Sequence, residues 1–533
     1  MIRDSLASAL RAALTAVGID APDQIHLERP ARREHGDWSS NVAMATAKKN
    51  GRNPRELAGE LVERINAAPP AHVERAEIAG PGFVNFHLRE TWLHDVLVDV
   101  IAGGEASFAR PDIGRGKKVN VEFVSANPTG PLHAGGGRWA AYGDSLCTIL
   151  ERCGHVVHRE YYLNDRGVQM GLFGASLAAR KAGTELPEDG YAGEYISEWA
   201  AEMPDDAEPS EWGYERVKAE LRTSLAGIGV EFDTWFSERS LVESGAVEAT
   251  LSDLRERGAA FDDDGAVWLR STQFGDDKDR VLVKSDGEPT YLLPDLAYHR
   301  DKFARGHELL IDIGGADHHG YVARLTAGVQ ALGHQPDEIE LILGQLVSLV
   351  RGGEEVRLSK RAGTIVLLDD LVAAVGADVA RLTFLLQSLD TRQTIDLDLI
   401  TAQSNENPVF YVQYANARIH SIARKVAEAG LTRGPLADAD LGLLVHEREL
   451  DVLRKLSELP EVVALACNDR APHKVTTWVR ELADRFHGFY HDCYVIGDVP
   501  PELTQARLWL VESARIGLAI GLDLLGVSAP ESM

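Results

Sequence analysis

A single histidine, His133, stands in a glycine-rich stretch, SANPTGPLHAGGGR, at residues 125–138. An apolar run precedes this stretch and an amphipathic pattern follows it, so the histidine falls where a strand turns into a helix. The unpaired backbone N–H groups at a helix start, together with the helix dipole, favour phosphate. Gly135 and Gly136 carry no side chains that would block a close approach. The stretch therefore predicts a site for a phosphorylated ligand.

The same stretch contains neither of two common phosphate-binding patterns, GxGxxG and GxxxxGK[ST]. Taken alone, it is equally consistent with a structural turn whose histidine has no chemical role. A second candidate stretch, RLSKR at residues 357–361, carries Ser359 and Lys360 between glycine-containing segments. A lysine on such a loop suits a movable clamp on a triphosphate, but a short basic run is more often solvated surface.

The segments around His133 have the pattern of an α/β sheet. The run KKVNVEFV (117–124) suits a buried strand, and HVVHREYYLN (155–164) suits a second one. Between them, RWAAYGDSLCTILERCG (138–154) reads as an amphipathic helix that ends on glycine. Strand, glycine-rich turn, helix and strand in this order form the first unit of a nucleotide-binding parallel sheet.

The chain of 533 residues is too long for one hydrophobic core, and its patterns change along its length. Residues 1–112 alternate helical patterns with a strand-like close, and residues 113–394 carry the α/β pattern. Within the latter, an acidic segment at about 170–275 looks like an insertion. Residues 395–533 show only helical periodicity, which is typical of a bundle. We expect an α/β protein of three domains.

The formal net charge of −27 argues at first against a nucleic-acid partner. Residues 181–280, however, hold 25 acidic and 10 basic residues, so more than half of the excess lies there and a polyanion can bind elsewhere. No uncharged apolar run is long enough for a membrane span, so we expect no membrane partner. Four cysteines without a CxxC pair or zinc spacing favour a reducing cytoplasm.

Read together, PLHAGG and RLSKR resemble the HIGH and KMSKS signatures of class I aminoacyl-tRNA synthetases. Almost from end to end, the chain is similar to the arginyl-tRNA synthetases. The matching stretches are HGDWSSNVAMATAKKNGRNPRELA, GPGFVNFHL, VEFVSANPTGPLHAGGGR, REYYLNDRGVQ, DDKDRVLVKSDGEPTYLLPDLAYHRDKF, GGADHHGYVAR, RLSKRAGTIVLLDDL, SNENPVFYVQYANARI and LLGVSAP. The resemblance implies a Rossmann-type class I catalytic domain at 113–394, an N-terminal α/β domain that contacts tRNA at 1–112, and an all-α anticodon-binding bundle at 395–533.

The resemblance also implies an activity, which is ligation of L-arginine to tRNA(Arg) through an arginyl-adenylate, with ATP and Mg²⁺, by a cytoplasmic monomer. The implied catalytic residues are His133 and Lys360. The implied ATP-binding residues are His133, Gly135, Gly136, His318, Ser359 and Lys360. The implied arginine-binding residues are Glu122, Asn127, Tyr291, Asp295 and Asp317. The residues expected to contact tRNA in the bundle are Asn407, Tyr411, Gln413, Tyr414 and Arg418, and those of the N-terminal domain are Arg32, Arg33, Lys48, Lys49, Arg52 and Arg55.

Other interpretations stay open on single residues. Gly136 stands where the family commonly has a second histidine, which would suit an inactive relative that binds tRNA or senses arginine. Asp295 follows Pro294 and has the position of a possible helix N-cap. His318 and His319 are adjacent, a poor spacing for two metal ligands on one helix face, so we expect no bound metal on side chains. A small nucleotidyltransferase with the same phosphate motif would not need the long helical bundle.

Overall fold

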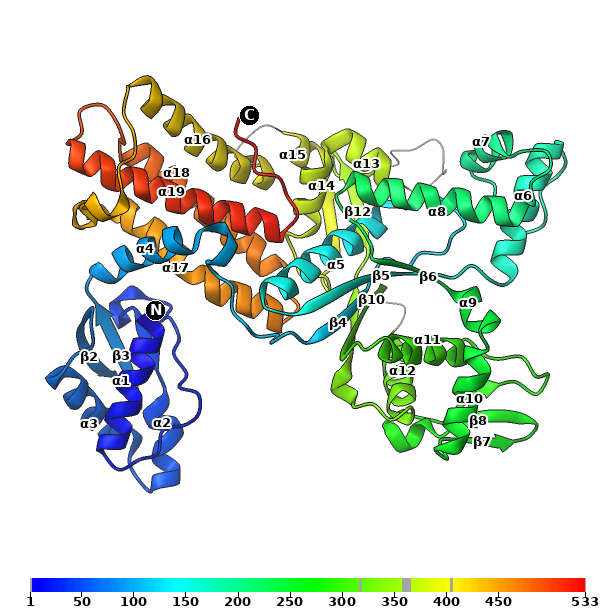
Figure 1. The fold of residues 1–533 in the computed structure, drawn as a ribbon, viewed down its shortest axis with the longest axis horizontal. Coiled ribbons are helices and arrows are strands. Elements are labelled where there is room, and N and C mark those ends of the chain that lie inside the picture. The colour runs from blue at the N-terminus through cyan, green and yellow to red at the C-terminus, as the bar shows by residue number, and fades with distance from the viewer. Residues whose placement is uncertain (1, 316–318, 357–365, 403–405, 533) are drawn as a thin grey trace. The chain divides into compact units, whose positions relative to one another are not determined.

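The computed structural model of the chain describes residues 2–315, 319–356, 366–402 and 406–532 (Figure 1). The chain divides into two compact units. The first unit comprises residues 1–108, 421–458 and 484–517, and the second comprises residues 109–420, 459–483 and 518–533. The helical C-terminal region therefore contributes to both units. The predicted domain boundaries at 112 and 394 stay predictions.

The second unit is built on a five-stranded sheet in which every neighbouring pair is parallel. Its order is β11 (Ile339–Gly344), β10 (Leu309–Gly315), β4 (Lys118–Glu122), β5 (Val156–Leu163) and β6 (Thr234–Ser237). Val119, Val121, Leu310 and Ile311 are completely buried in its central strands. Apolar central strands of this kind are typical of a parallel sheet. The carboxyl ends of all five strands lie along one edge, which is where such sheets bind ligands.

The predicted strand–turn–helix–strand unit is confirmed as β4, α5 (Ala134–Arg152) and β5. The helix begins four residues earlier than its amphipathic pattern. His133 occupies the N-cap position, so the three glycines that follow form the first turn of the helix. They also make close packing possible, because a Cβ at Gly137 would lie 2.5 Å from Leu368 Cδ1.

The segment at 170–275 was expected to be an insertion into the α/β domain, but one of its strands belongs to the parallel sheet itself. It does contain the helices α6 (Val168–Ala182), α7 (Glu194–Glu202), α8 (Pro209–Gly227), α9 (Glu238–Glu243) and α10 (Ala246–Glu256). Its strand β6, however, pairs with β5 and forms an edge of the parallel sheet. The four residues TWFS are too short to give a clear strand period beside so many charges. A separate antiparallel sheet follows, formed by β7 (Ala260–Asp263), β8 (Ala266–Leu269) and β9 (Arg280–Val283).

Two further helices follow in this unit, and the first of them carries Asp295 of the predicted arginine site. These are α11 (Leu292–Ala304) and α12 (His319–Ala331). A small sheet of β12 (Val347–Arg351), β13 (Glu354–Glu355) and β14 (Gln393–Asp396) follows, with the helices α13 (Leu368–Val375), α14 (Ala377–Phe384) and α15 (Leu397–Thr401).

The N-terminal part of the first unit packs helices on an antiparallel sheet. The sheet has the order β1 (Trp38–Ser40), β3 (Phe83–Leu88) and β2 (Val73–Ala79), and the helices are α1 (Ile2–Ala16), α2 (Val42–Ala47), α3 (Pro54–Ala67) and α4 (Thr91–Ser107). The helix α1 is amphipathic, since Leu6, Leu10 and Leu14 on one of its faces are completely buried.

The predicted helical region after residue 395 is confirmed by four long helices. They are α16 (Pro408–Glu428), α17 (Glu447–Asn468), α18 (His473–Asp492) and α19 (Pro501–Leu524). Within the described residues, no helix combines the length and the apolar character that crossing a membrane requires. The cysteines Cys147, Cys153, Cys467 and Cys493 are buried free thiols.

Candidate active site

The glycine-rich turn holds the His133 ring in a defined orientation. Its Nδ1 accepts a hydrogen bond from the backbone N–H of Gly136 at 3.2 Å, which caps α5. Loss of hydration lowers the pKa of His133, so the ring is neutral near pH 7. Because Nδ1 is an acceptor, the proton lies on Nε2. The imidazole therefore presents one N–H donor at the mouth of the helix.

A side chain at residue 136, where the family commonly has its second histidine, would displace Leu132 from its present position. A Cβ on Gly136 would lie 2.5 Å from Leu132 Cδ1, and Leu132 is buried. A Cβ on Gly135 would lie 3.0 Å from the His133 ring. The two glycines therefore leave space for Leu132 on one side and for the catalytic candidate His133 on the other.

Residues 366–368, which come shortly after RLSKR in the sequence, are hydrogen-bonded to this turn. The N–H of Leu368 donates to the carbonyl of Leu132, and the N–H of Ala134 donates to the carbonyl of Val366, each at 2.8 Å. His133 and Leu367 thus form an antiparallel bridge. The flank of the second motif and the first motif lie side by side, although more than 200 residues separate them in the sequence.

Ser359 and Lys360, and likewise Asp317 and His318, lie outside the described residues. Their predicted roles stay predictions.

The turn after β4 is strained and holds the carboxylate of Glu122. Val124 and Ser125 have positive φ values of 68° and 42°, and positive φ is unusual for a β-branched residue. This reversal brings the Ser125 hydroxyl back to Glu122 Oε1, to which it donates at 2.9 Å. Backbone strain of this kind costs roughly 1–3 kcal/mol per residue and is concentrated at functional sites.

Asp295 lies four residues into α11, and Tyr291 occupies the N-cap position. The interpretation of Asp295 as a helix cap is therefore wrong. Its carboxylate instead accepts a hydrogen bond from the Tyr321 hydroxyl of α12. Burial raises the pKa of Asp295 to about 6, with Glu122 and Glu238 adding to that rise and the Tyr321 hydrogen bond and His299 opposing it.

Glu238, the first residue of α9, is a carboxylate that sequence reasoning missed. Burial raises its pKa, and it accepts a hydrogen bond from the Tyr162 hydroxyl. Glu122, Glu238 and Asp295 all act electrostatically on Tyr162, so we call these three residues the carboxylate cluster. Glu238 directly follows a strand, as Glu122 ends one, and this position after TWFS was the available signal.

Two other predicted arginine residues lie at the surface. The Tyr291 side chain is 85% exposed at the start of α11. Asn127 is exposed as well, and its Nδ2 donates to Gln169 Oε1 at 2.8 Å. Neither side chain is bound to the carboxylate cluster by an interaction described for this structure.

The predicted tRNA-binding residues in α16 and just before it have different environments. Asn407 is buried and its amide is fully used, because Nδ2 donates to Ile400 O and Ala402 O while Oδ1 accepts from Val409 and Phe410. Gln413 is also buried, and its Nε2 donates to Asp378 Oδ2 at 2.9 Å. Burial and bonds within the chain argue against the predicted tRNA role of both residues, and for Asn407 they use both the amide donor and the amide acceptor.

The remaining α16 candidates are half-buried. Tyr414 stacks on Phe410 with ring centres 5.7 Å apart, and the Arg418 guanidinium lies 4.3 Å from the Tyr414 ring centre. Tyr411 is half-buried one turn before. Aromatic and guanidinium groups of this kind suit unpaired RNA bases.

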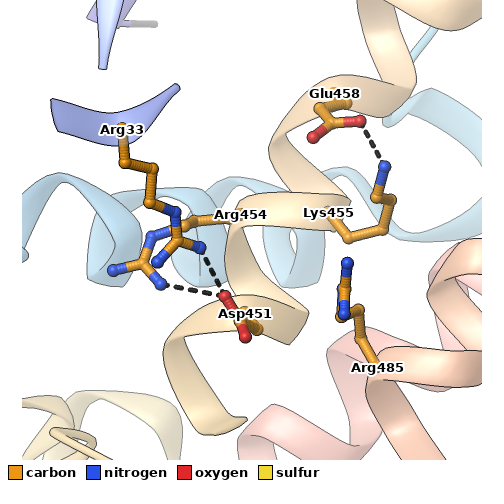
Figure 2. Close-up of a pocket in the computed structure, with 6 residues that line it drawn as sticks. All are labelled: Arg33, Asp451, Arg454, Lys455, Glu458 and Arg485. Atoms are coloured by element: carbon orange, nitrogen blue, oxygen red, sulfur yellow. Dashed lines mark hydrogen bonds and ion pairs between the residues drawn. The ribbon is translucent and has the colours of Figure 1, made fainter. Parts of the chain in front are cut away.

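A polar pocket of about 360 Å³ in the first unit contains Arg33, one of the predicted basic residues. Figure 2 shows Arg33 and Arg454 directed at Asp451, and Lys455 directed at Glu458. The four basic residues of the pocket are matched by neighbouring carboxylates, because Glu447 also pairs with Arg33 and Asp484 lies 3.5 Å from Arg485. Arg33 thus belongs to an ion-pair network, whereas Lys48 and Lys49 are exposed.

Three family models match the chain. The model of the arginyl tRNA synthetase N terminal domain matches residues 2–88, that of the tRNA synthetases class I (R) catalytic domain matches residues 102–189 and 216–397, and that of the DALR anticodon binding domain matches residues 412–533.

Solved structures with the same fold include three described as arginyl-tRNA synthetases. One from Campylobacter jejuni is 33% identical, with a TM-score of 0.76 over 84% of this chain and 100% of that chain. One from Thermus thermophilus is 22% identical, with a TM-score of 0.79 over 100% of both chains. One from Plasmodium falciparum is 16% identical, with a TM-score of 0.76 over 100% of this chain and 99% of that chain.

The parallel sheet, its histidine-capped turn and the catalytic-domain match define a class I aminoacyl-tRNA synthetase, which uses ATP. The match covers more than half of the residues, and the Campylobacter jejuni structure exceeds 30% identity. The chain belongs to the arginyl-tRNA synthetase family and joins arginine to tRNA(Arg).

Proposed function

We propose that the carboxylate cluster binds the guanidinium group of arginine. A guanidinium is a planar cation with five N–H donors, and carboxylates bind it in a fixed geometry. Asp295 and Glu238 both have raised pKa values because burial disfavours their anions, so a cation that reaches them relieves an existing electrostatic cost. The observation that carries the proposal is that Glu122 and Glu238 lie close enough to Asp295 to raise its pKa, and that all three carboxylates are half-buried. Tyr291, Asn127 and Asp317 complete the proposed arginine site.

The proposed ATP site lies at the glycine-rich turn. The first step forms a bond between an arginine carboxylate oxygen and the α-phosphorus and breaks the bond to the β-phosphate, which releases pyrophosphate. His133 donates its Nε2 proton to a triphosphate oxygen, and Gly135 and Gly136 allow the phosphates to approach the helix. Lys360 stabilises the leaving pyrophosphate, while Ser359 and His318 shape the site. The 3′-terminal ribose hydroxyl of tRNA then attacks the arginyl carbonyl and releases AMP.

Magnesium enters the proposed reaction with ATP. Among the described residues, no group of three or more histidine, cysteine or carboxylate side chains is placed to hold a metal ion. Phosphate oxygens are the usual Mg²⁺ ligands in enzymes that bind nucleoside triphosphates. When bound, Mg²⁺ neutralises phosphate charge.

The proposed tRNA contacts comprise Tyr411, Tyr414 and Arg418 of α16 and the exposed basic residues of the N-terminal domain. We also propose three domains, at 1–112, 113–394 and 395–533. The match of the N-terminal domain model to residues 2–88 and that of the anticodon-binding domain model to residues 412–533 support this proposal. We infer a monomer that acts in the cytoplasm.

The test is ATP–pyrophosphate exchange with arginine, measured with and without tRNA(Arg). An active enzyme exchanges only with arginine present, and lysine does not replace it, because a compact three-donor ammonium cannot span the carboxylate cluster. An inactive relative, which Gly136 would suit, binds tRNA or arginine without exchange. His133→Ala serves as the matched variant, since it removes the Nε2 donor. Exchange that persists at the wild-type rate in that variant contradicts the proposed role of His133.

A further inference from the structure

A buried ion-pair network lies directly behind the carboxylate cluster. Lys302, on the last turn of α11, has an exposed fraction of 0%. Its Nζ lies 2.6 Å from Glu122 Oε2 and 2.8 Å from Asp312 Oδ1. The same Nζ lies 4.3 Å from the centre of the Tyr298 ring. A fully buried ammonium is costly unless its donors are used, and here two carboxylates and an aromatic face surround it.

His299 extends this network to the backbone of Asp295. Its Nε2 lies 2.7 Å from Asp312 Oδ2, and its Nδ1 lies 2.7 Å from the carbonyl oxygen of Asp295. Carbonyl and carboxylate oxygens only accept, so both ring nitrogens donate and the ring is an imidazolium. Burial opposes that charge, but Asp312 raises the pKa of His299. Burial likewise opposes ionisation of Asp312, but Lys302 and His299 hold its pKa below the usual range.

The network forms an unbroken chain of contacts from Asp295 to Glu122. Its members are His299, Asp312, Lys302 and Glu122, with charges that alternate in sign and cancel. They come from three elements, because α11 supplies both cations, β10 supplies Asp312 and β4 supplies Glu122. Register brings two of these elements together, since Asp312 of β10 pairs with Glu122 of β4.

Both oxygens of Glu122 are consequently held. Oε1 accepts from the Ser125 hydroxyl and Oε2 accepts from Lys302. A carboxylate bound at both oxygens does not rotate, so its remaining lone pairs keep one direction. Its charge is already balanced by Lys302, and Arg166 lies 3.8 Å from Glu238 Oε1, so the unpaired negative charge that meets an incoming cation comes mainly from Asp295.

We propose that Lys302, with Asp312 and His299, is a positioning residue that fixes Glu122 and Asp295 relative to each other for binding of the arginine guanidinium. The inference rests on the proposed function of those two carboxylates. Lys302 itself does not touch arginine. Without its ammonium, Glu122 and Asp312 would face each other as like charges, and the Glu122 side chain would turn away from Lys302's position.

The experiment compares Lys302→Met and Asp312→Asn with Arg305→Met in the full-length chain. Arg305 is a matched control, because it follows the same helix and its guanidinium holds the completely buried Glu160 at 2.6 and 2.8 Å, outside the carboxylate cluster. KM for arginine, KM for ATP and kcat are measured by tRNA charging, with the melting temperature of each variant. Asp312→Asn is isosteric, so it decides the question if Lys302→Met does not fold.

We expect KM for arginine to rise about 10–100-fold in both test variants, the range found when outer partners of metal ligands are removed. KM for ATP stays within about twofold, and kcat at saturating arginine falls less than KM rises. Arg305→Met keeps its arginine KM while its melting temperature falls. Unchanged arginine KM in Asp312→Asn, or an equal rise in Arg305→Met, overturns the positioning role. If Glu122→Gln and Asp295→Asn also leave arginine KM unchanged, the proposed arginine site itself fails.

Discussion

The carboxylate cluster and the polar face of α16 differ in how well residue type predicts role. Glu122 and Asp295 were both predicted for arginine, and the structure brings them close enough for the charge of one to raise the pKa of the other. Asn407 and Gln413 were predicted for tRNA, but they are buried and hydrogen-bonded within the chain. Parallel strand ends converge on one edge whatever their loops do, whereas packing decides which helix residues face solvent.

Asp295→Asn gives the largest effect expected within the carboxylate cluster. The change is isosteric and removes a charge that meets the guanidinium, so kcat/KM for arginine should fall about 10⁴-fold, as in sites built for a hydrogen-bonded ligand. The melting temperature should change little, because Tyr291 and not Asp295 occupies the N-cap position. Charging assays and thermal unfolding measure the two. Near-wild-type kinetics would remove Asp295 from the arginine site.

Lys360→Ala tests a residue whose catalytic role is predicted from the sequence motif alone. Its ammonium is needed mainly when the leaving pyrophosphate develops charge, so kcat for adenylate formation should fall about 10²–10³-fold, as for loss of one preorganised donor. KM for arginine should stay near wild type, since the carboxylate cluster is intact. The rate of ATP–pyrophosphate exchange at varied ATP and arginine concentrations checks this. An unchanged kcat with a raised KM for ATP would contradict the assigned role.

Arginine binding should weaken in acid because of the carboxylate cluster. The pKa of Asp295 is raised to about 6, so the anion that binds the cation is present above that pH and lost below it. KM for arginine should rise about tenfold per pH unit below pH 6 and stay level above pH 7. Glu238, whose pKa is also raised, adds to the loss, while Tyr321 stays neutral and His299 stays protonated. A KM that is flat from pH 5 to 7 contradicts an ionised Asp295 as the binding form.

The smallest expected effects come from Tyr411 and Asn407. They distinguish a residue that binds tRNA from a residue that stabilises the fold. Tyr411→Ala should raise KM for tRNA about tenfold, since stacking of one base is worth about 1–3 kcal/mol. Asn407→Ala should leave KM for tRNA unchanged and lower the free energy of unfolding by about 1 kcal/mol, because it removes a helix cap. Charging assays at varied tRNA concentration give KM for tRNA, and denaturant unfolding gives the free energy of unfolding of both variants. The reverse assignment of the two effects would restore Asn407 as a tRNA residue and exclude Tyr411.

Agreement between sequence and structure is closest where local patterns and motifs coincide. The unit β4–α5–β5, the helix N-terminus at His133 and the four C-terminal helices followed from periodicity and glycine placement. Glu238 did not follow, because strand β6 is only four residues long and lies in a charge-rich segment. The cap interpretation of Asp295 was wrong because it took Pro294 as the residue just before the helix. The helix begins at Leu292, so Pro294 is its third residue and Asp295 its fourth.

By itself, the sequence determined the α/β class, the histidine at the helix mouth and the resemblance to arginyl-tRNA synthetases, since these depend on neighbouring residues and ordered motifs. Only the tertiary structure decided which carboxylates share one environment and which are already paired. Lys302 meets Glu122 across 180 residues, and Asn407 turns inward to cap α16. Such partnerships depend on strand register and on how helices pack, and no local pattern carries that information.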